Sequence, residues 1–119
     1  ARVALGTELP ALFSNDDELA VDLKKLAENE NDPLWRLPLW KPYKRMIAGK
    51  VADLSNAPES GFGGAITAAL FLQSFVLDNI SWAHLDLMAW NMSSRPGQPE
   101  GGDAMTMRTI FAFLSQRFG

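Results

Sequence analysis

The residues best suited to acid–base or metal chemistry are His84 and Asp86, which lie two positions apart in the partly alternating run Ser81-Trp-Ala-His-Leu-Asp-Leu-Met88. If this run is a strand, both side chains point to the same face of a sheet. An imidazole and a carboxylate there could form half of a metal site, or a general base with the group that orients it. The chain has one histidine and no companion ligand motif. We therefore favour a core histidine whose ring nitrogens bond to the backbone or to Asp86.

Two other patterns also have a chemical and a structural interpretation. Gly61-Phe-Gly-Gly64 precedes a predicted helix, whose free amides would attract an anion. It lacks the Gly-Lys-Ser/Thr ending of a phosphate loop and the dinucleotide spacing, so we favour close backbone packing. The acidic cluster Asp16, Asp17 and Glu18 could be a metal site. The positive end of a helix dipole explains these carboxylates more simply.

The usual hydrolase motifs are absent from the sequence. There is no Gly-x-Ser-x-Gly and no His-Glu-x-x-His. The chain also has no cysteine, which excludes disulfides, thiolate chemistry and cysteine zinc sites. Met88, at the end of the predicted strand, is a candidate for lining an apolar pocket. The residues alone supply no complete catalytic constellation.

Two extended runs and an amphipathic helix are predicted in the first third of the chain. The apolar run Arg2 to Thr7 predicts a buried strand. The run Leu9 to Phe13 predicts an extended segment that Pro10 confines to an irregular or edge position. A helix of about three turns should begin within Ser14 to Glu18 and end before Pro33. After it, Leu34 to Tyr43 reads as an extended loop pinned by its aromatic residues Trp35, Trp40 and Tyr43.

A buried helix, a strand and a final helix are predicted further along. The stretch Ala65 to Leu77 contains no charged residue, so we expect a helix buried on most sides, in which a charge at Ala68 would be costly. The strand Ser81 to Met88 and the turn-rich loop Ser93 to Gly102 follow. The last helix should run from about Asp103 to Phe118, with an apolar stripe at Met107, Ile110, Phe111, Leu114 and Phe118. This order predicts an α/β fold with a mixed sheet flanked by helices.

Composition narrows the classes of protein. The 119 residues are one domain or part of one, with 47% hydrophobic and 21% charged residues, as in a folded globular chain. A net charge of −3 gives no basic surface for nucleic acid and no polybasic patch for a membrane. The longest apolar stretch is too short to span a bilayer, and no signal peptide is visible. Because the chain opens without methionine, we expect it to belong to a longer polypeptide.

Four stretches, in this order, resemble the C-terminal region of the cytosolic leucyl aminopeptidase family. Ala1-Arg-Val-Ala-Leu-Gly with Leu12-Phe-Ser-Asn-Asp16 resembles the strand and turn after that family's Thr-Leu-Thr-Gly-Ala segment. Trp35-Arg-Leu-Pro-Leu39 is similar to a loop of the family. Ala52-Asp-Leu-Ser-Asn56 with the run from Gly63 to Leu72 resembles its buried helix, and Trp82-Ala-His-Leu-Asp86 its late strand. The resemblance covers nearly the whole chain and implies that residues 1–119 are the C-terminal part of an aminopeptidase catalytic domain.

The resemblance implies a cytoplasmic, homohexameric enzyme that removes N-terminal amino acids from peptides with two divalent ions, zinc or manganese. The family's metal ligands and its catalytic Arg and Lys lie upstream of the Thr-Leu-Thr-Gly-Ala segment. No metal ligand and no catalytic residue can therefore be assigned to this chain, and we expect the isolated chain to be inactive.

One contribution to the active site is implied within the chain. In the family, residues just after the His-Leu-Asp strand shape the pocket for the first side chain of the substrate. Here those positions read Leu87-Met-Ala-Trp-Asn91, where many members have Ile-Ala-Gly, and they make Met88, Ala89 and Asn91 the candidate substrate-binding residues. Two alternatives stay open: a non-enzymatic α/β interaction module, and a degenerate family member that kept the fold without the metals.

Overall fold

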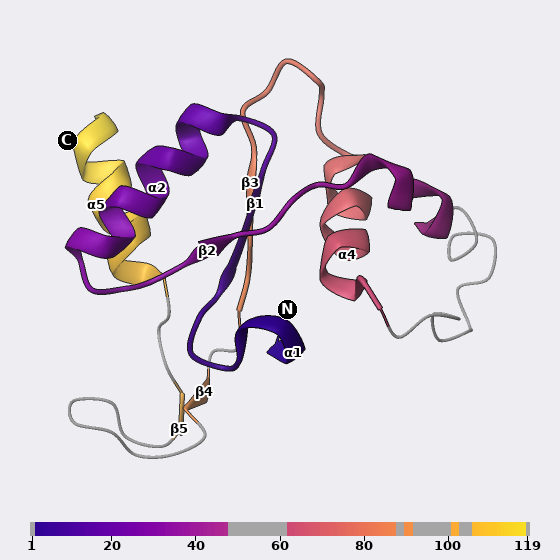
Figure 1. The fold of residues 1–119 in the computed structure, drawn as a ribbon. Helices are drawn as coiled ribbons and strands as arrows, with labels where there is room; N and C mark the ends of the chain where they lie inside the picture. Colours follow the sequence, from indigo (N-terminus) through magenta and orange to yellow (C-terminus); the bar gives the residue numbers. More distant parts are fainter. Residues whose placement is uncertain (1, 48–61, 88–89, 92–100, 103–105, 119) are drawn as a thin grey trace.

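The computed structural model describes residues 2–47, 62–87, 90–91, 101–102 and 106–118. At its centre is a mixed three-stranded sheet with the order β2-β1-β3. Strand β1 (Ala11–Ser14) pairs in parallel with β2 (Trp35–Arg36) and antiparallel with β3 (Ala83–Asp86). Helices α2 (Asp17–Asn29) and α5 (Met107–Phe118) lie on one side of this sheet, and α4 (Gly64–Gln73) lies on the other (Figure 1). The predicted α/β class with a mixed sheet flanked by helices is confirmed.

Strand β1 divides the core in two, because successive side chains of a strand point to opposite faces. Leu12 packs toward α2, in a cluster with Leu19, Ala20, Leu23, Ala27 and Leu34 that Ile110 and Phe113 of α5 complete. Ala11 and Phe13 pack on the other face against Ala69 of α4. Both clusters depend on a strand whose four residues are all buried.

The start of the chain differs from the sequence-based expectation. Arg2–Leu5 forms a short helix, α1, and not a strand. Gly6 has a φ of 81°, the left-handed conformation that ends many helices. The next run is the central strand and not an edge, since Pro10 lies just before its first residue and uses only its carbonyl, which accepts a hydrogen bond from the Trp35 amide at 3.0 Å.

The segment after α2 is held by leucines and not by its tryptophans. Leu34 is 3% exposed, whereas Trp35 and Trp40 are 49% and 53% exposed. Backbone hydrogen bonds join this segment to β1, including one from the Leu37 amide to the Leu12 carbonyl at 2.8 Å. The predicted loop therefore contains β2, followed by a 3-10 turn, η1 (Lys41–Tyr43), and helical residues 44–47.

Helix α4 is shorter and less buried than its composition predicted. It ends at Gln73, and its buried residues are Thr67, Ala69 and Leu70. Ala68 is exposed, and Phe75 and Leu77, which follow the helix, are 75% and 72% exposed. An uncharged helix is buried all round only where polypeptide surrounds it, and here the sheet covers one side.

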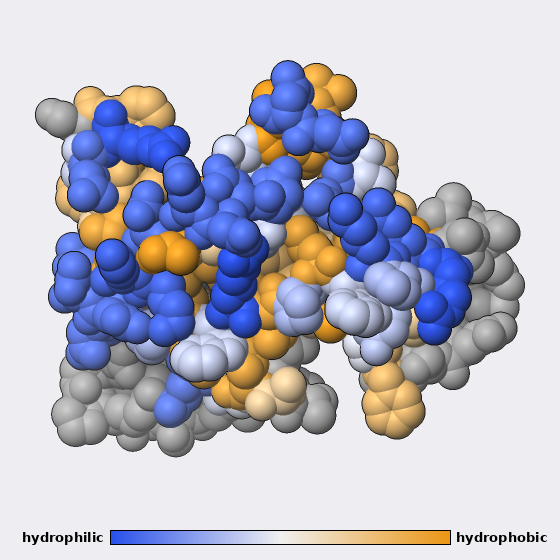
Figure 2. Space-filling model, turned by 45° about the horizontal axis from the view of Figure 1, so that its top comes forward, coloured by the Kyte–Doolittle hydropathy of each residue, from blue (hydrophilic) through white to orange (hydrophobic). Residues whose placement is uncertain are grey.

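Helix α5 also turns a different face to the core. Its core contacts come from Thr109, Ile110 and Phe113. Four of the five residues of the predicted stripe are exposed instead: Met107, Phe111, Leu114 and Phe118. Figure 2 shows the resulting apolar surface, where orange patches interrupt the hydrophilic blue.

The loop that was expected from Ser93 to Gly102 lies largely outside the described residues. Its last two residues, Gly101–Gly102, form β5, which pairs antiparallel with β4 (Trp90–Asn91). Among the described helices, none is long and apolar enough to cross a membrane.

Candidate functional site

His84 lies in an aromatic stack on β3. Its ring centroid is 6.0 Å from that of Phe13, its partner in the β1–β3 register, and 6.2 Å from that of Trp82. Asp86 lies on the same strand, opposite Ala11. The described part of the chain brings no group of three His, Cys, Asp or Glu residues together in a way that could hold a metal ion. His84 is half-buried, and the stack gives its ring a packing role against Phe13 and Trp82.

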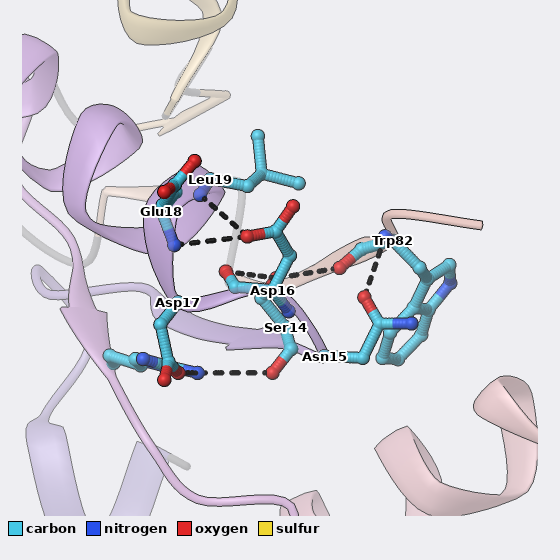
Figure 3. Close-up of polar contacts among 8 residues, drawn as sticks. Ser14, Asn15, Asp16, Asp17, Glu18, Leu19 and Trp82 are labelled. Atoms are coloured by element: carbon cyan, nitrogen blue, oxygen red, sulfur yellow. Dashed lines mark hydrogen bonds and ion pairs between the residues drawn. The ribbon is translucent and has the colours of Figure 1, made fainter. Parts of the chain in front are cut away.

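The acidic cluster at the start of α2 is resolved into separate structural roles. The Asp16 carboxylate accepts hydrogen bonds from the amides of Glu18 at 3.0 Å and Leu19 at 3.3 Å, so Asp16 caps the helix (Figure 3). Asp17 pairs with the Arg36 guanidinium at 2.7 Å. The Asp16 cap, with Asp17 and Glu18 in the first turn of α2, confirms the helix-start interpretation of the cluster.

A second hydrogen bond to Asp16 ties α2 to the approach to β3. The Ser81 hydroxyl donates to the other carboxylate oxygen of Asp16 at 2.6 Å. This bond, together with those from the Leu19 and Glu18 amides, lowers the pKa of Asp16 below its ordinary value. Each of these donors favours the charged form of the carboxyl group.

The neighbouring residues Ser14 and Asn15 hold the same connection. The Asn15 side chain accepts from the Trp82 amide and donates to the Ile80 carbonyl, both at 2.8 Å. The Ser14 hydroxyl donates to the Trp82 carbonyl at 2.7 Å (Figure 3). Ser14-Asn15-Asp16 is thus a polar clamp between the end of β1 and the start of β3, and it carries no group left over for chemistry.

The described part of the glycine-rich segment also has a structural explanation. Gly63 caps α4 with a φ of 67°, and a Cβ there would lie 3.3 Å from the Tyr43 ring. Close packing against Tyr43 therefore explains this glycine, in agreement with the packing interpretation. Gly61 lies outside the described residues.

A buried carboxylate that the sequence interpretation did not identify lies at the start of α5. Asp32 is 6% exposed and accepts hydrogen bonds from the amides of Thr106 and Thr109, each at 3.0 Å. The single proton of the Thr109 hydroxyl is shared between the backbone carbonyl and the carboxylate of Asp32, which lie 3.0 and 3.1 Å from the hydroxyl oxygen. Asp32 therefore caps α5 from far away in the sequence, and Thr106 is held there at a φ of 65°. Sequence spacing carries no signal for a cap supplied from another segment.

A hollow at the end of the sheet was also missed, because its lining comes from three separate segments. A cavity of about 870 Å³ lies at the carboxyl ends of the parallel strands β1 and β2, the usual location of ligands in α/β sheets. Charged residues of both signs line it: Asp17, Arg36, Lys41, Lys44 and Asp78. Arg36 is already paired with Asp17 and bonded to the Ser14 carbonyl. The lining therefore favours neither an anionic nor a cationic ligand.

The strand that precedes the candidate substrate-binding residues ends on the side of the sheet away from this cavity. Ala11, the first residue of β1, is opposite Asp86, so the end of β3 lies beside the beginning of β1 and away from the cavity. Asn91 is in β4, opposite Gly101. Met88 and Ala89 lie outside the described residues, so the pocket assignment remains a prediction.

A family model described as "Cytosol aminopeptidase family, catalytic domain" matches residues 1–111. The probable cytosol aminopeptidase of Nitratidesulfovibrio vulgaris is 41% identical over 117 residues, covering 96% of this chain and 23% of that protein. The corresponding protein of Syntrophotalea carbinolica is 41% identical over 116 residues, with coverages of 96% and 23%. The chain thus spans about a quarter of the length of the curated relatives it matches.

Solved structures show the same fold. A cytosol aminopeptidase from Coxiella burnetii superposes with a TM-score of 0.89 at 52% identity, covering 99% of this chain and 26% of that chain. The bottromycin maturation enzyme BotP, solved in complex with Mn, gives a TM-score of 0.87 at 37% identity, covering 98% of this chain and 26% of that chain.

Proposed function

We propose that this chain is the C-terminal part of a metal-dependent aminopeptidase that removes N-terminal amino acids from peptides. The chain belongs to the cytosol aminopeptidase family, because the model of that family's catalytic domain matches residues 1–111. The observation that carries the proposal is the 52% identity, over 99% of the chain, to a solved cytosol aminopeptidase with the same fold. The recognition of the family from four short stretches agrees with this match.

The described residues supply no metal site for this activity. A hydroxide nucleophile at neutral pH needs a metal to lower the pKa of water from about 15.7 to about 7. His84 and Asp86 fall short of the three protein ligands that a catalytic ion usually has, and His84 is stacked between Phe13 and Trp82. The zinc or manganese ions of the complete enzyme would be held by another part of the polypeptide. The role of this chain is to complete the sheet and one wall of the site.

The isolated 119-residue chain is therefore expected to be inactive. With added zinc or manganese, the purified chain should not hydrolyse a leucine chromogenic amide above background. Turnover that a chelator abolishes would show that ligands inside this chain suffice, contrary to the proposal.

Met88, Ala89 and Asn91 are proposed to shape the pocket for the first side chain of the substrate. The support is their place in the sequence just after β3, which ends beside the start of β1. The family resemblance implies that residues after this strand shape the pocket. Methionine is flexible and polarisable, which suits an adaptable apolar pocket. The competing interpretation is that Met88 only packs in the core.

The two interpretations of Met88 differ in kinetics. The test enzyme is a chimera in which this chain replaces the matching quarter of the Coxiella burnetii cytosol aminopeptidase. For a pocket residue, Met88→Ala should change the preference for leucine over alanine substrates by about 1–3 kcal/mol, or about 10- to 200-fold. A lowered melting temperature with an unchanged preference would leave Met88 as a core residue.

The sequence encoded immediately upstream of this chain discriminates the proposal from its alternatives. An active enzyme should carry there the family's Asn-Thr-Asp-Ala-Glu-Gly-Arg segment and its Lys- and Asp-containing segment. A related sequence without those carboxylates would favour a degenerate member. An unrelated sequence would favour a non-enzymatic interaction module.

A cytoplasmic location and a homo-oligomer, specifically a homohexamer, complete the proposal. The location is supported by relatives named cytosol aminopeptidases. The oligomer rests on the family resemblance.

A further inference from the structure

The connection between β1 and β3 includes polar side chains as well as the backbone ladder. The polar clamp Ser14-Asn15-Asp16 binds three consecutive residues, 80–82, which lead into β3. The Asn15 side chain alone spans two of them, since it accepts from the Trp82 amide (Figure 3) and donates to the Ile80 carbonyl. All of these donors and acceptors belong to the described part of this chain. The clamp therefore forms without any contribution from further polypeptide.

The sequence of β3 leaves two registers against β1 open. A slip by one residue would exchange the two faces of the strand and is costly. A slip by two residues keeps the faces and would bring Leu87 to the place of Leu85, which packs against the core cluster around α2. The apolar contact is made by a leucine in both registers. The ring contact of His84 with Phe13 and the polar clamp remain to distinguish them.

Ser81 allows the clamp to select the observed register. In this register Ser14 lies opposite Ala83, and the Ser81 hydroxyl donates to the Asp16 carboxylate at 2.6 Å. The two-residue slip would bring Ala83 to the position of Ser81, and the alanine side chain has no hydrogen-bond donor. The Asp16 carboxylate would then lose this partner. The clamp thus favours one register where the leucine contact does not.

The register of β3 determines where the residues after this strand lie. Each residue of slip moves a strand by about 3.4 Å, so a two-residue slip would displace the following residues by about 7 Å. A misplacement of about 1 Å at an active site can cost about 100-fold in rate. A clamp at the beginning of β3 therefore acts on residues that follow the other end of the strand.

We propose that the Asn15 and Ser81 contacts of the clamp fix the register of β3 and thereby position the substrate-binding residues that follow it. Asn15 and Ser81 are positioning residues, because they act through β3. The inference rests on the proposed function, in which the residues after β3 shape the substrate pocket.

The register can be measured with disulfides, because the chain has no cysteine of its own. Residues directly opposite each other in an antiparallel pair are close enough for a disulfide. Ala11→Cys with Asp86→Cys reports the observed register, in which these two residues are opposite. Ala11→Cys with Met88→Cys reports the two-residue slip. Each pair is equilibrated with a glutathione buffer in the chimera described above, and the disulfide is identified by mass spectrometry.

The test variant is the double substitution of Asn15→Ala with Ser81→Ala. The Ser81 hydrogen bond to a charged group contributes a factor of about ten, so the ratio of the observed-register disulfide to the slipped disulfide should fall at least about fivefold. The matched control is Asn29→Ala with Ser74→Ala, because both residues are exposed and lie at the ends of their own helices. It should change the ratio less than about twofold.

Kinetics of the same chimera, without added cysteines, tests the positioning role. The double variant should raise KM for a leucine substrate at least about fivefold and lower the preference for leucine over alanine substrates, while kcat for the alanine substrate changes less than about twofold. Asp32→Ala is the control for lost stability, because it removes the α5 cap and leaves the clamp intact. It should leave the substrate preference unchanged.

The outcomes separate the clamp from the proposed function. An unchanged disulfide ratio, or an equal change in the Asn29→Ala, Ser74→Ala control, overturns the claim that the clamp sets the register. A changed ratio with an unchanged substrate preference overturns the positioning role. A chimera without turnover before any clamp substitution refutes the proposed function instead, and the disulfide ratio still decides whether the clamp sets the register.

Discussion

Replacing Asp32 by alanine removes the carboxylate that caps α5 from 74 residues away. The side chain is 6% exposed, and its two oxygens accept from the Thr106 amide, the Thr109 amide and the Thr109 hydroxyl. In the variant, the two amides lose their partner where water has little access. Thr106 also keeps its left-handed backbone conformation, which is unusual for a β-branched residue, without the hydrogen bond that holds it.

The magnitude follows from two effects that partly overlap. Loss of a helix cap costs about 1–2 kcal/mol, and each buried donor left without a partner costs about 1–3 kcal/mol. Together they should lower the free energy of unfolding by about 3–4 kcal/mol. For a domain of this size, 1 kcal/mol corresponds to about 4 °C in melting temperature, so a decrease of about 12–16 °C is expected.

The measurement is thermal and urea unfolding followed by circular dichroism. Asp22→Ala is the control, because Asp22 is exposed on α2 and its loss should change stability by less than about 0.5 kcal/mol. Asp32→Asn should fall between the two, since one amide oxygen can still accept. A cost below about 1 kcal/mol for Asp32→Ala, or one equal to that of Asp22→Ala, would refute the capping argument.

Two other predictions test the core and the polar clamp. Ala69→Glu should lower the free energy of unfolding by about 3 kcal/mol or more, because Ala69 is fully buried where α4 packs on the sheet. The control is Ala68→Glu, one residue away on the exposed side, which should lower that free energy by less than about 0.5 kcal/mol. Equal effects of the two variants in urea unfolding would contradict the orientation of α4. Ser81→Ala should raise the pKa of Asp16, measured by NMR titration, because the Ser81 hydroxyl is the largest cause of its lowering. The carboxylate is favoured in the folded state, so its contribution to stability is complete above about pH 3.9 and is lost as the pH falls through the lowered pKa; Ser81→Ala should therefore lose less stability than the parent chain on acidification, and an unchanged titration would count against the bond.

The fold class was predictable because local signals agreed with tertiary structure where they were strongest. The leucines and the acidic start of α2 specify a helix with one buried side, and Asp16 caps it as its residue type suggests. The family resemblance rested on short motifs such as Trp82-Ala-His-Leu-Asp86, part of which forms β3. The substrate-binding residues proposed from that resemblance remain a prediction, because Met88 and Ala89 lie outside the described residues and Asn91 is described only as part of β4.

The failures have physical causes of their own. Arg2–Leu5 is apolar after its first residue but short, and a run of that length is compatible with a strand or with one turn of helix. The apolar stripe predicted for α5 is mostly exposed, because periodicity identifies an apolar face without saying what covers it. Asp32 was missed because its partners, Thr106 and Thr109, are distant in the sequence.

The most direct test of the proposed function is the aminopeptidase activity of the chimera with the Coxiella burnetii enzyme, in which this chain replaces the matching 26% of that enzyme. We expect it to hydrolyse a leucine chromogenic amide with kcat/KM within about tenfold of the unaltered enzyme. Activity should require zinc or manganese and be abolished by a chelator, and the same enzyme with its matching quarter deleted should be inactive. A folded chimera without chelator-sensitive turnover would contradict the proposal that this chain is a working part of an aminopeptidase.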